Sequence, residues 1–335
     1  CHRASGAGSV EGGLYLPPIT ARALFSDEPP RRIDLYQELF QEELEFETWA
    51  RLRQRSPRPA YTEATLARVL RDGVDPTGRK LDPRMPRYRL SEQEILDLRA
   101  YLVALGAPAP GVDTEKILFA AVIPESSRGS QSALVATSEA FVRWKNADTA
   151  RLRVRSPDPL EQEDDWPLAY RTWSLEVWRV ADDPMTWRRE FEAKQQAQPV
   201  FALWANLSDF PSESAAVLRS FCEAQEIPCL FLGAAKRERG EFVRGFPGGA
   251  CAEGSFDSEP PQTFRARQWL RARGLPSPAS RSEENVQLAS YSLLTLAEVA
   301  VRQLLDNFSR AAFLEAIDRE AERMPFAVGC ASGRS

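Results

Sequence analysis

The first third of the chain alternates between loop-forming stretches and short segments with helical periodicity. Apolar side chains recur there at three- and four-residue spacing with few β-branched runs, which favours short α-helices over strands. In the last of these segments, Ser91 and Glu94 have the spacing of a capping box. The pattern predicts three helices, over Asp34–Arg53, Tyr61–Asp72 and Ser91–Leu105.

The remainder of the chain shows strand-like apolar runs that alternate with helical segments. The predicted strands are Ile117–Ile123, Arg151–Arg155, Tyr170–Val180, Val200–Ala205 and Cys229–Leu232. The predicted helices are Gln131–Lys145, Met185–Gln196, Glu213–Gln225 and three later ones over 262–273, 283–305 and 309–323. This alternation is typical of βαβ units and of a mostly parallel sheet covered on both faces.

Two prolines and two glycines separate these patterns, over Gly106–Gly111. Neither residue type favours continuation of the preceding helix, so this stretch is typical of a linker. A length of 335 residues also favours two domains over one. We therefore expect an all-α domain over residues 1–108, a linker over 109–114 and a mostly parallel α/β domain over 115–335.

Composition and charge indicate an ordinary globular protein, with 43% hydrophobic and 27% charged residues and a net charge of -5. The basic side chains are scattered along the chain, so the positive surface of a nucleic-acid-binding protein is not expected. No apolar run reaches the length of about 18 residues that a membrane-spanning helix needs. We therefore expect no nucleic-acid partner and no membrane-spanning helix.

The chain contains a single histidine, His2, which excludes a histidine-dependent triad or a zinc site with several histidines elsewhere in the chain. Acidic groups such as Glu163-Asp164-Asp165 are interpreted as solvated loop charges. Nothing in the sequence resembles a catalytic site for bond-making chemistry. We therefore expect an electron carrier or a binding protein rather than an enzyme.

The sharpest chemical signal combines Cys1-His2 with Met85. A Cys-His pair at the end of a C-x-x-C-H motif attaches haem, because the cysteine thiols bond to the porphyrin and the imidazole ligates the iron. The opposite face of the iron then needs a second ligand. A methionine thioether suits that position because it is a soft donor that raises the potential of a His-ligated haem.

Residues 1–108 resemble a class I cytochrome c domain. The resemblance rests on CHRASGAG at the start, on LPPIT shortly after it, and on YTEATLARVLRDGVDPTGRKLDPRMPRYRLSEQEILDLRAYLVALG. It implies one covalently attached haem c, with His2 as proximal ligand, Met85 as distal ligand and Cys1 as a thioether cysteine. It also implies assembly in the periplasm of a Gram-negative bacterium and a dehydrogenase or oxidase as redox partner.

One feature of Cys1 departs from that family, because the first cysteine of the motif is not part of this sequence. Three explanations stay open: that cysteine lies upstream, the haem is attached by a single bond, or this domain has lost its haem. A lipid-modified Cys1 is the alternative interpretation of a chain that begins with cysteine.

The second domain is similar to type I periplasmic substrate-binding proteins, which include those for branched-chain amino acids. The similar segments are ILFAAVIPESSRGSQ, EAKQQAQPVFALWANLSDFPSESAAVLRSFCEAQEIPCLFLG and ASYSLLTLAEVAVRQLLDNFSRAAFLEAI. Too few residues follow Leu232 for a complete second lobe, so we expect a reduced one. The resemblance implies a role in docking, or in binding a ligand as proteins of ABC transporters do.

A ligand pocket is expected at the carboxyl ends of the strands, where parallel sheets bind ligands. Hydroxyl and amide side chains there suit an amino acid or a small carboxylate. The candidate residues are Glu125, Ser126, Ser127, Asn206 and Ser208. The alternative is that these side chains solvate or cap their loops.

Two other residue types admit more than one interpretation. Four cysteines, Cys222, Cys229, Cys251 and Cys330, allow three pairings, and a bond between the first two would join a helix to the next strand. Two buried thiols would give the same pattern. The tryptophans gathered at the start of the second domain are interpreted as core or interface residues before a binding groove: Trp144, Trp166, Trp173, Trp178, Trp187 and Trp204.

Overall fold

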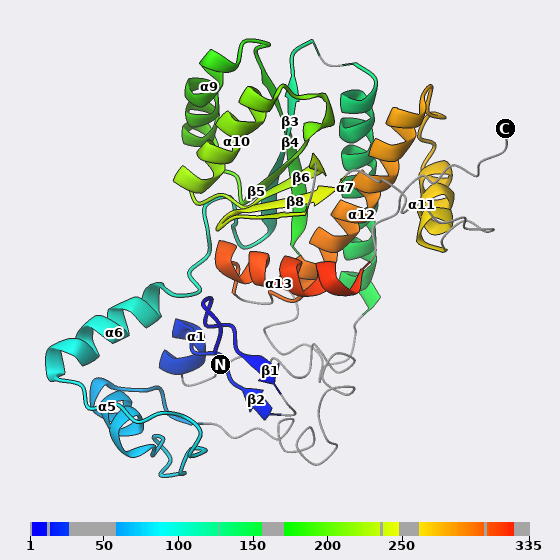
Figure 1. Ribbon diagram of the computed structural model, residues 1–335. Helices are drawn as coiled ribbons and strands as arrows, with labels where there is room; N and C mark the ends of the chain where they lie inside the picture. The colour runs from blue at the N-terminus through cyan, green and yellow to red at the C-terminus, as the bar shows by residue number, and fades with distance from the viewer. Residues whose placement is uncertain are drawn as a thin grey trace. The chain divides into compact units, whose positions relative to one another are not determined.

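The computed structural model describes residues 2–11, 14–26, 58–126, 128–155, 171–234, 237–247, 261–304 and 307–324. The chain divides into two compact units. Figure 1 colours the chain by residue number and labels the helices and strands. Unit 1 contains residues 1–108 with 163–169 and 303–312, and unit 2 contains the remainder. The predicted helix Asp34–Arg53 lies outside the described residues. In the described part of the chain, no helix is both long and apolar enough to cross a membrane.

Unit 1 combines short helices with a small antiparallel ribbon. Among its described residues, the helices are α1 (Ala21–Phe25), α5 (Glu63–Asp72) and α6 (Glu92–Ala104), and the strands are β1 (Ser9–Glu11) and β2 (Leu14–Leu16). The expectation of an all-α unit is corrected by this ribbon, in which Ser9 pairs with Leu16 and Glu11 with Leu14. Two short runs separated by Gly-Gly have the signature of a hairpin, which the helical periodicity of the neighbouring segments obscured.

Helices α5 and α6 follow the capping signals of the sequence. The Thr62 hydroxyl accepts a hydrogen bond from the Thr65 amide at the start of α5. Gly73 ends that helix in the left-handed conformation, at φ 69°. The predicted capping box of α6 is confirmed, since Ser91 and Glu94 bond to each other's backbone amides. A hydrophobic cluster centred on Leu66, Val69 and Ile95 includes residues of both helices.

Unit 2 contains a six-stranded, mostly parallel sheet, as expected. Its strands are β3 (Lys116–Pro124), β4 (Thr172–Val180), β5 (Ala202–Asn206), β6 (Cys229–Ala234), β7 (Glu238–Arg239) and β8 (Val243–Pro247). They lie in the order β4-β3-β5-β6-β8-β7, and only β7 is antiparallel to its neighbour. The described helices are α7 (Ser130–Arg155), α9 (Pro184–Ala197), α10 (Ser212–Ala224), α11 (Pro261–Ala272), α12 (Arg281–Arg302) and α13 (Arg310–Arg323), of which α13 belongs to unit 2 from Phe313 onward.

The predicted strand Arg151–Arg155 is wrong, because α7 continues through these residues. Their alternation of apolar and basic residues has the period of a strand, but arginine and leucine are also good helix formers. Extending an existing helix adds one hydrogen bond per residue without a new nucleation cost. Strands β7 and β8 were not predicted, because Gly240, Gly245 and Pro247 interrupt their apolar pattern.

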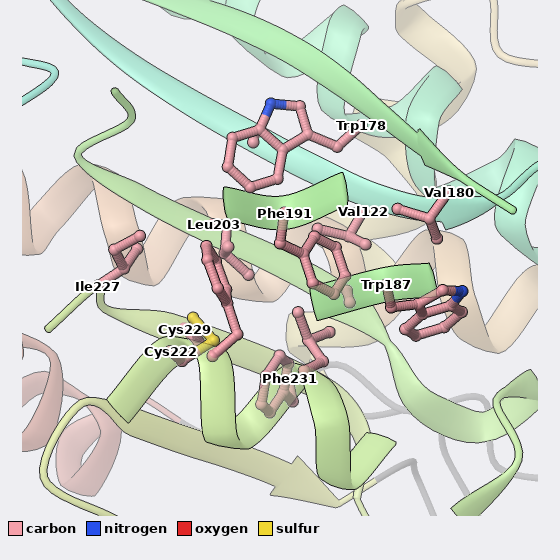
Figure 2. Close-up of a cluster of buried hydrophobic side chains, with 14 of the residues drawn as sticks. Val122, Trp178, Val180, Trp187, Phe191, Leu203, Cys222, Ile227, Cys229 and Phe231 are labelled. Carbon is pink, nitrogen blue, oxygen red and sulfur yellow. A yellow bond between two sulfur atoms is a disulfide. The ribbon is translucent and has the colours of Figure 1, made fainter. Parts of the chain in front are cut away.

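Helices cover both faces of the sheet, with α9 and α10 on one face and α7 and α12 on the other (Figure 1). The α9–α10 face packs Trp187 and Phe191 against Trp178 of β4. Figure 2 shows this cluster, with the disulfide bond at its edge. The interpretation of Trp173, Trp178, Trp187 and Trp204 as core is confirmed, since each is at most 4% exposed.

The disulfide joins Cys222 of α10 to Cys229 of β6, with 6.1 Å between the two Cα atoms. Of the interpretations that the sequence left open for these residues, the structure shows the bond between a helix and the next strand. Both cysteines are fully buried. Cys251 and Cys330 lie outside the described residues.

Candidate functional site

His2 is held by a hydrogen bond from its ring to the backbone. Its Nδ1 atom lies 2.8 Å from the carbonyl oxygen of Pro17. Because a carbonyl oxygen only accepts, Nδ1 carries the proton and donates. In the neutral ring, Nε2 then has its lone pair available for a metal. The side chain is partly exposed.

Glycines shape the loop of residues 2–8 that begins at His2. The Gly8 amide donates to the His2 carbonyl at 3.0 Å, and the Ile19 amide donates to the Gly6 carbonyl at 2.9 Å. Gly8 has φ +77°, and a Cβ atom there would lie 2.4 Å from the carbonyl oxygen of Leu16. A larger residue at position 8 would therefore separate this loop from the Leu16–Pro17 segment that holds the His2 ring.

Met85 lies, partly buried, in a turn organised by Asp82. The Met85 amide donates to the Asp82 carbonyl at 3.1 Å. Hydrogen bonds from the side chain and then the backbone amide of Arg84 lower the pKa of the Asp82 carboxyl to about 2. The ionised carboxylate therefore stays in place throughout the neutral range and fixes the turn next to Met85.

Arg87 anchors the same turn to the end of α5. Its guanidinium donates to the carbonyl oxygen of Met85. It also covers Gly73, where a Cβ atom would lie 2.2 Å from Arg87 Nη2. The next amide, of Tyr88, donates to the Leu70 carbonyl at 2.8 Å. Arg87 and Tyr88 thus connect the Met85 turn to the C-terminal end of α5.

Asp75 organises the chain between α5 and the Met85 turn. Its carboxylate is 2% exposed and accepts from Thr77 Oγ1 at 2.7 Å and from Arg79 Nε at 3.1 Å. Burial disfavours the charged form, but the hydrogen bonds from Thr77 and Arg79 outweigh it and lower the pKa. Asp75 belongs to no recognisable sequence motif, so sequence analysis did not single it out.

In unit 2, the carboxyl ends of the strands carry the predicted pocket residues. Helix α7 follows β3 on one face of the sheet and α10 follows β5 on the other, so the neighbouring strands β3 and β5 form a topological switch point. Ser126, after β3, is exposed and donates from Oγ to Asp182 Oδ1 at 2.6 Å. The Glu125 amide donates to the Val180 carbonyl at 2.8 Å, and Ser127 lies outside the described residues.

Asn206 is the most buried of the predicted pocket residues, at 1% exposure. Its carbonyl oxygen accepts from Gln131 Nε2 at 3.1 Å, and its Oδ1 accepts from the Ser208 amide at 3.3 Å. Within the described part of the chain, its Nδ2 has no hydrogen-bond partner. Gly233 closes the same cluster, because a Cβ atom there would lie 2.0 Å from Ser208 Oγ.

The structure therefore brings Asn206 and Ser208 together and adds Gln131 and Gly233, which sequence analysis missed. Ser126 instead pairs with Asp182, another residue that was not predicted. His2 and Met85 occupy separate loops of unit 1, and Cys1 lies outside the described residues. In the ranges that the structure describes, no group of three or more His, Cys, Asp or Glu side chains is placed to hold a metal ion. Comparison with protein-family models, curated proteins and solved structures finds no match.

Proposed function

We propose that the chain is a periplasmic mono-haem c-type cytochrome that transfers one electron between protein partners such as a dehydrogenase and an oxidase. Residues 1–108 belong to the haem-binding unit, and the α/β unit acts in docking or ligand sensing. No substrate bond is made or broken in this function.

The hydrogen bond from His2 Nδ1 to the Pro17 carbonyl is the observation that carries the proposal. Metal-bound histidines typically donate their second ring N–H to a carbonyl or carboxylate oxygen, which fixes the tautomer and the ring orientation. This bond leaves Nε2 of His2 as the ligand atom. The sulfur of Met85 supplies a second donor that suits haem iron.

A covalently attached haem, when bound, supplies a one-electron couple at its iron. The chain's own residues hold the two ligand atoms. The Pro17 carbonyl orients the His2 ring, while Asp82 and Arg87 restrict the turn that carries Met85. A restricted ligand loop changes little between oxidation states, which favours fast electron transfer.

The buried disulfide Cys222–Cys229 supports the proposed compartment. Disulfides persist in oxidising environments such as the bacterial periplasm and are rare in the cytosol. Assembly of c-type haem outside the cytoplasm places the two units in the same compartment. The bond and the haem proposal therefore agree, although they involve different halves of the chain.

The proposal is tested by a haem stain after denaturing electrophoresis and by a reduced-minus-oxidised absorption spectrum. The chain is produced in a periplasm that matures c-type cytochromes, with any native residues that precede Cys1 included. We expect a covalent haem with a His/Met spectrum, which Met85→Ala abolishes and which His2→Ala prevents from forming. Met185→Ala is the matched control, because Met185 is 90% exposed in unit 2. A colourless protein would refute the electron-transfer function.

A second candidate function is binding of a solute by unit 2, as in binding proteins of ABC transporters. The buried Asn206 side chain at the switch point favours solute binding, since its Nδ2 group can donate hydrogen bonds to a ligand. Under this function, free amino acids and small carboxylates raise the melting temperature in proportion to RT ln(1 + [L]/Kd). Asn206→Ala removes the effect, whereas Gln196→Ala, at an exposed amide, retains it.

A further inference from the structure

Unit 1 contains a hydrogen bond between the His2 loop and a segment more than three hundred residues away. Asn307 Nδ2 donates to the carbonyl oxygen of Ser5 at 3.1 Å. Ser5 is 0% exposed and Asn307 is 2% exposed, so water does not compete for this bond. Residues 303–312, which include Asn307, belong to unit 1 although they connect α12 to α13 along the chain.

The orientation of the Asn307 amide follows from its other contact. Its Oδ1 accepts from the Ser309 amide at 3.3 Å, which directs Nδ2 away from its own segment. The backbone amide of Asn307 donates to the Leu304 carbonyl at 2.7 Å. These local contacts fix the orientation of the Asn307 side chain, so that its Nδ2 group is directed at the Ser5 carbonyl.

The end of α6 closes the same region. A Cβ atom on Gly106 would lie 2.6 Å from Thr20 Cγ2 and 3.3 Å from Asn307 Oδ1. A Cβ atom on Gly6 would lie 2.5 Å from Leu105 Cδ2. Glycines thus allow α6, the His2 loop and the Asn307 segment to approach closely. The buried Ser5 carbonyl accepts its hydrogen bond from Asn307 within this packed region.

We propose that Asn307 is a positioning residue for His2, an inference that rests on the proposed haem function. Ser5 lies three residues after His2, in the loop whose Gly8 amide donates back to the His2 carbonyl. Removal of the Asn307 amide takes this buried hydrogen bond away from the loop, which weakens the attachment of the loop to the Asn307 segment. The ring of His2 then changes its orientation against Pro17, and the reduction potential changes with it.

Two neutral variants test the role, Asn307→Ala and Asn307→Leu, the second of which keeps the size of the side chain. The matched control is Asn146→Ala, because Asn146 Nδ2 donates to the Trp173 carbonyl at 2.8 Å in unit 2. We expect both Asn307 variants to change the redox equilibrium constant about threefold, roughly 28 mV at 59 mV per tenfold change. We also expect a weaker absorption band of the Met-ligated ferric haem. The Asn146 variant loses stability but keeps the potential.

Hydrogen exchange separates this proposal from the haem proposal, because the measurement does not require bound haem. The Asn307 variants should lose protection at the amides of Gly6, Ala7 and Gly8, while Asn146→Ala should not. If neither variant folds, Asn307→Asp decides in the same measurement, because it keeps the acceptor for the Ser309 amide and removes the donor to Ser5: lost protection supports the anchor, and unchanged protection contradicts it. Folded Asn307 variants with an unchanged potential would overturn the positioning role even where the haem stain is positive.

Discussion

The Met85 turn of unit 1 and the strand-end cluster of unit 2 are organised by similar hydrogen bonds over very different sequence distances. The Asp82 carboxylate accepts from the Arg84 amide, two residues away, at 2.9 Å. Gln131 reaches the Asn206 carbonyl across 75 residues, at 3.1 Å. A local bond forms as its short segment folds, whereas a long-range bond requires the sheet to be complete. Changes to unit 1 turns should therefore act locally, and changes to unit 2 should act on the whole unit.

The largest effect is expected from a long-range ion pair in unit 2. Arg244 of β8 donates from Nε to Asp318 Oδ1 of α13 at 2.6 Å, and its side chain is only 9% exposed. Asp318→Ala leaves this arginine buried without its carboxylate, which costs about 3 kcal/mol of unfolding free energy. Urea unfolding followed by tryptophan fluorescence measures it. Glu139→Ala, which removes the exposed partner of Arg143, is the control and should change little.

The disulfide comes next in expected size. It closes a short loop, since Cys222 and Cys229 are separated by 7 positions. The double substitution Cys222→Ala with Cys229→Ala should lower the free energy of unfolding by about 2 kcal/mol, because the unfolded chain regains the entropy of that loop. Urea unfolding measures the difference between the variant and the original chain, first without a reductant and then with one that opens the disulfide of the original chain. A difference between the variant and the original chain that persists after full reduction would instead indicate a packing defect.

A local effect is expected at the start of α6. Ser91→Ala removes the hydroxyl that accepts from the Glu94 amide, which should cost about 1 kcal/mol. Hydrogen exchange should show the loss in the amides of α6, and the fluorescence transition of unit 2 should stay where it is. Gln93→Ala, in the same turn, keeps the cap and is the control. A loss of protection that extends through unit 2 would contradict the local character of this contact.

The smallest effect is the pH dependence of the Asp82 turn. Arg84 lowers the pKa of this carboxyl from 3.8 to about 2, so the folded state favours the charged form. The stabilisation is complete above the unfolded pKa near 3.8, and it is lost as the pH falls through about 2. Asp82→Asn should remove this part of the acid sensitivity. Thermal unfolding between pH 5 and pH 2 checks it, where the original chain should lose more stability than the variant.

Elements whose signals are local could be predicted from the sequence. The capping box of Ser91 and Glu94 lies within one turn, and the apolar run Ile117–Ile123 predicts strand β3, in which these seven residues are all buried. The prediction failed where two local patterns compete, as at Arg151–Arg155, which the preceding helix incorporates. It also failed at β7 and β8, because β7 is only two residues long and Gly245 interrupts the apolar pattern of β8; pairing of β8 with β6, and of β7 with β8, stabilises them.

The sequence by itself determined the residue chemistry of this protein: one histidine beside a cysteine, a methionine in a charged turn, and strands alternating with helices. Only the tertiary structure decided which partners these residues have. It joined Cys222 to Cys229 among several possible pairings, and it placed Asn307 against Ser5. The physical reason is that composition and periodicity act over a few residues, whereas a long-range bond depends on the chain path between its ends, which packing of the whole unit sets.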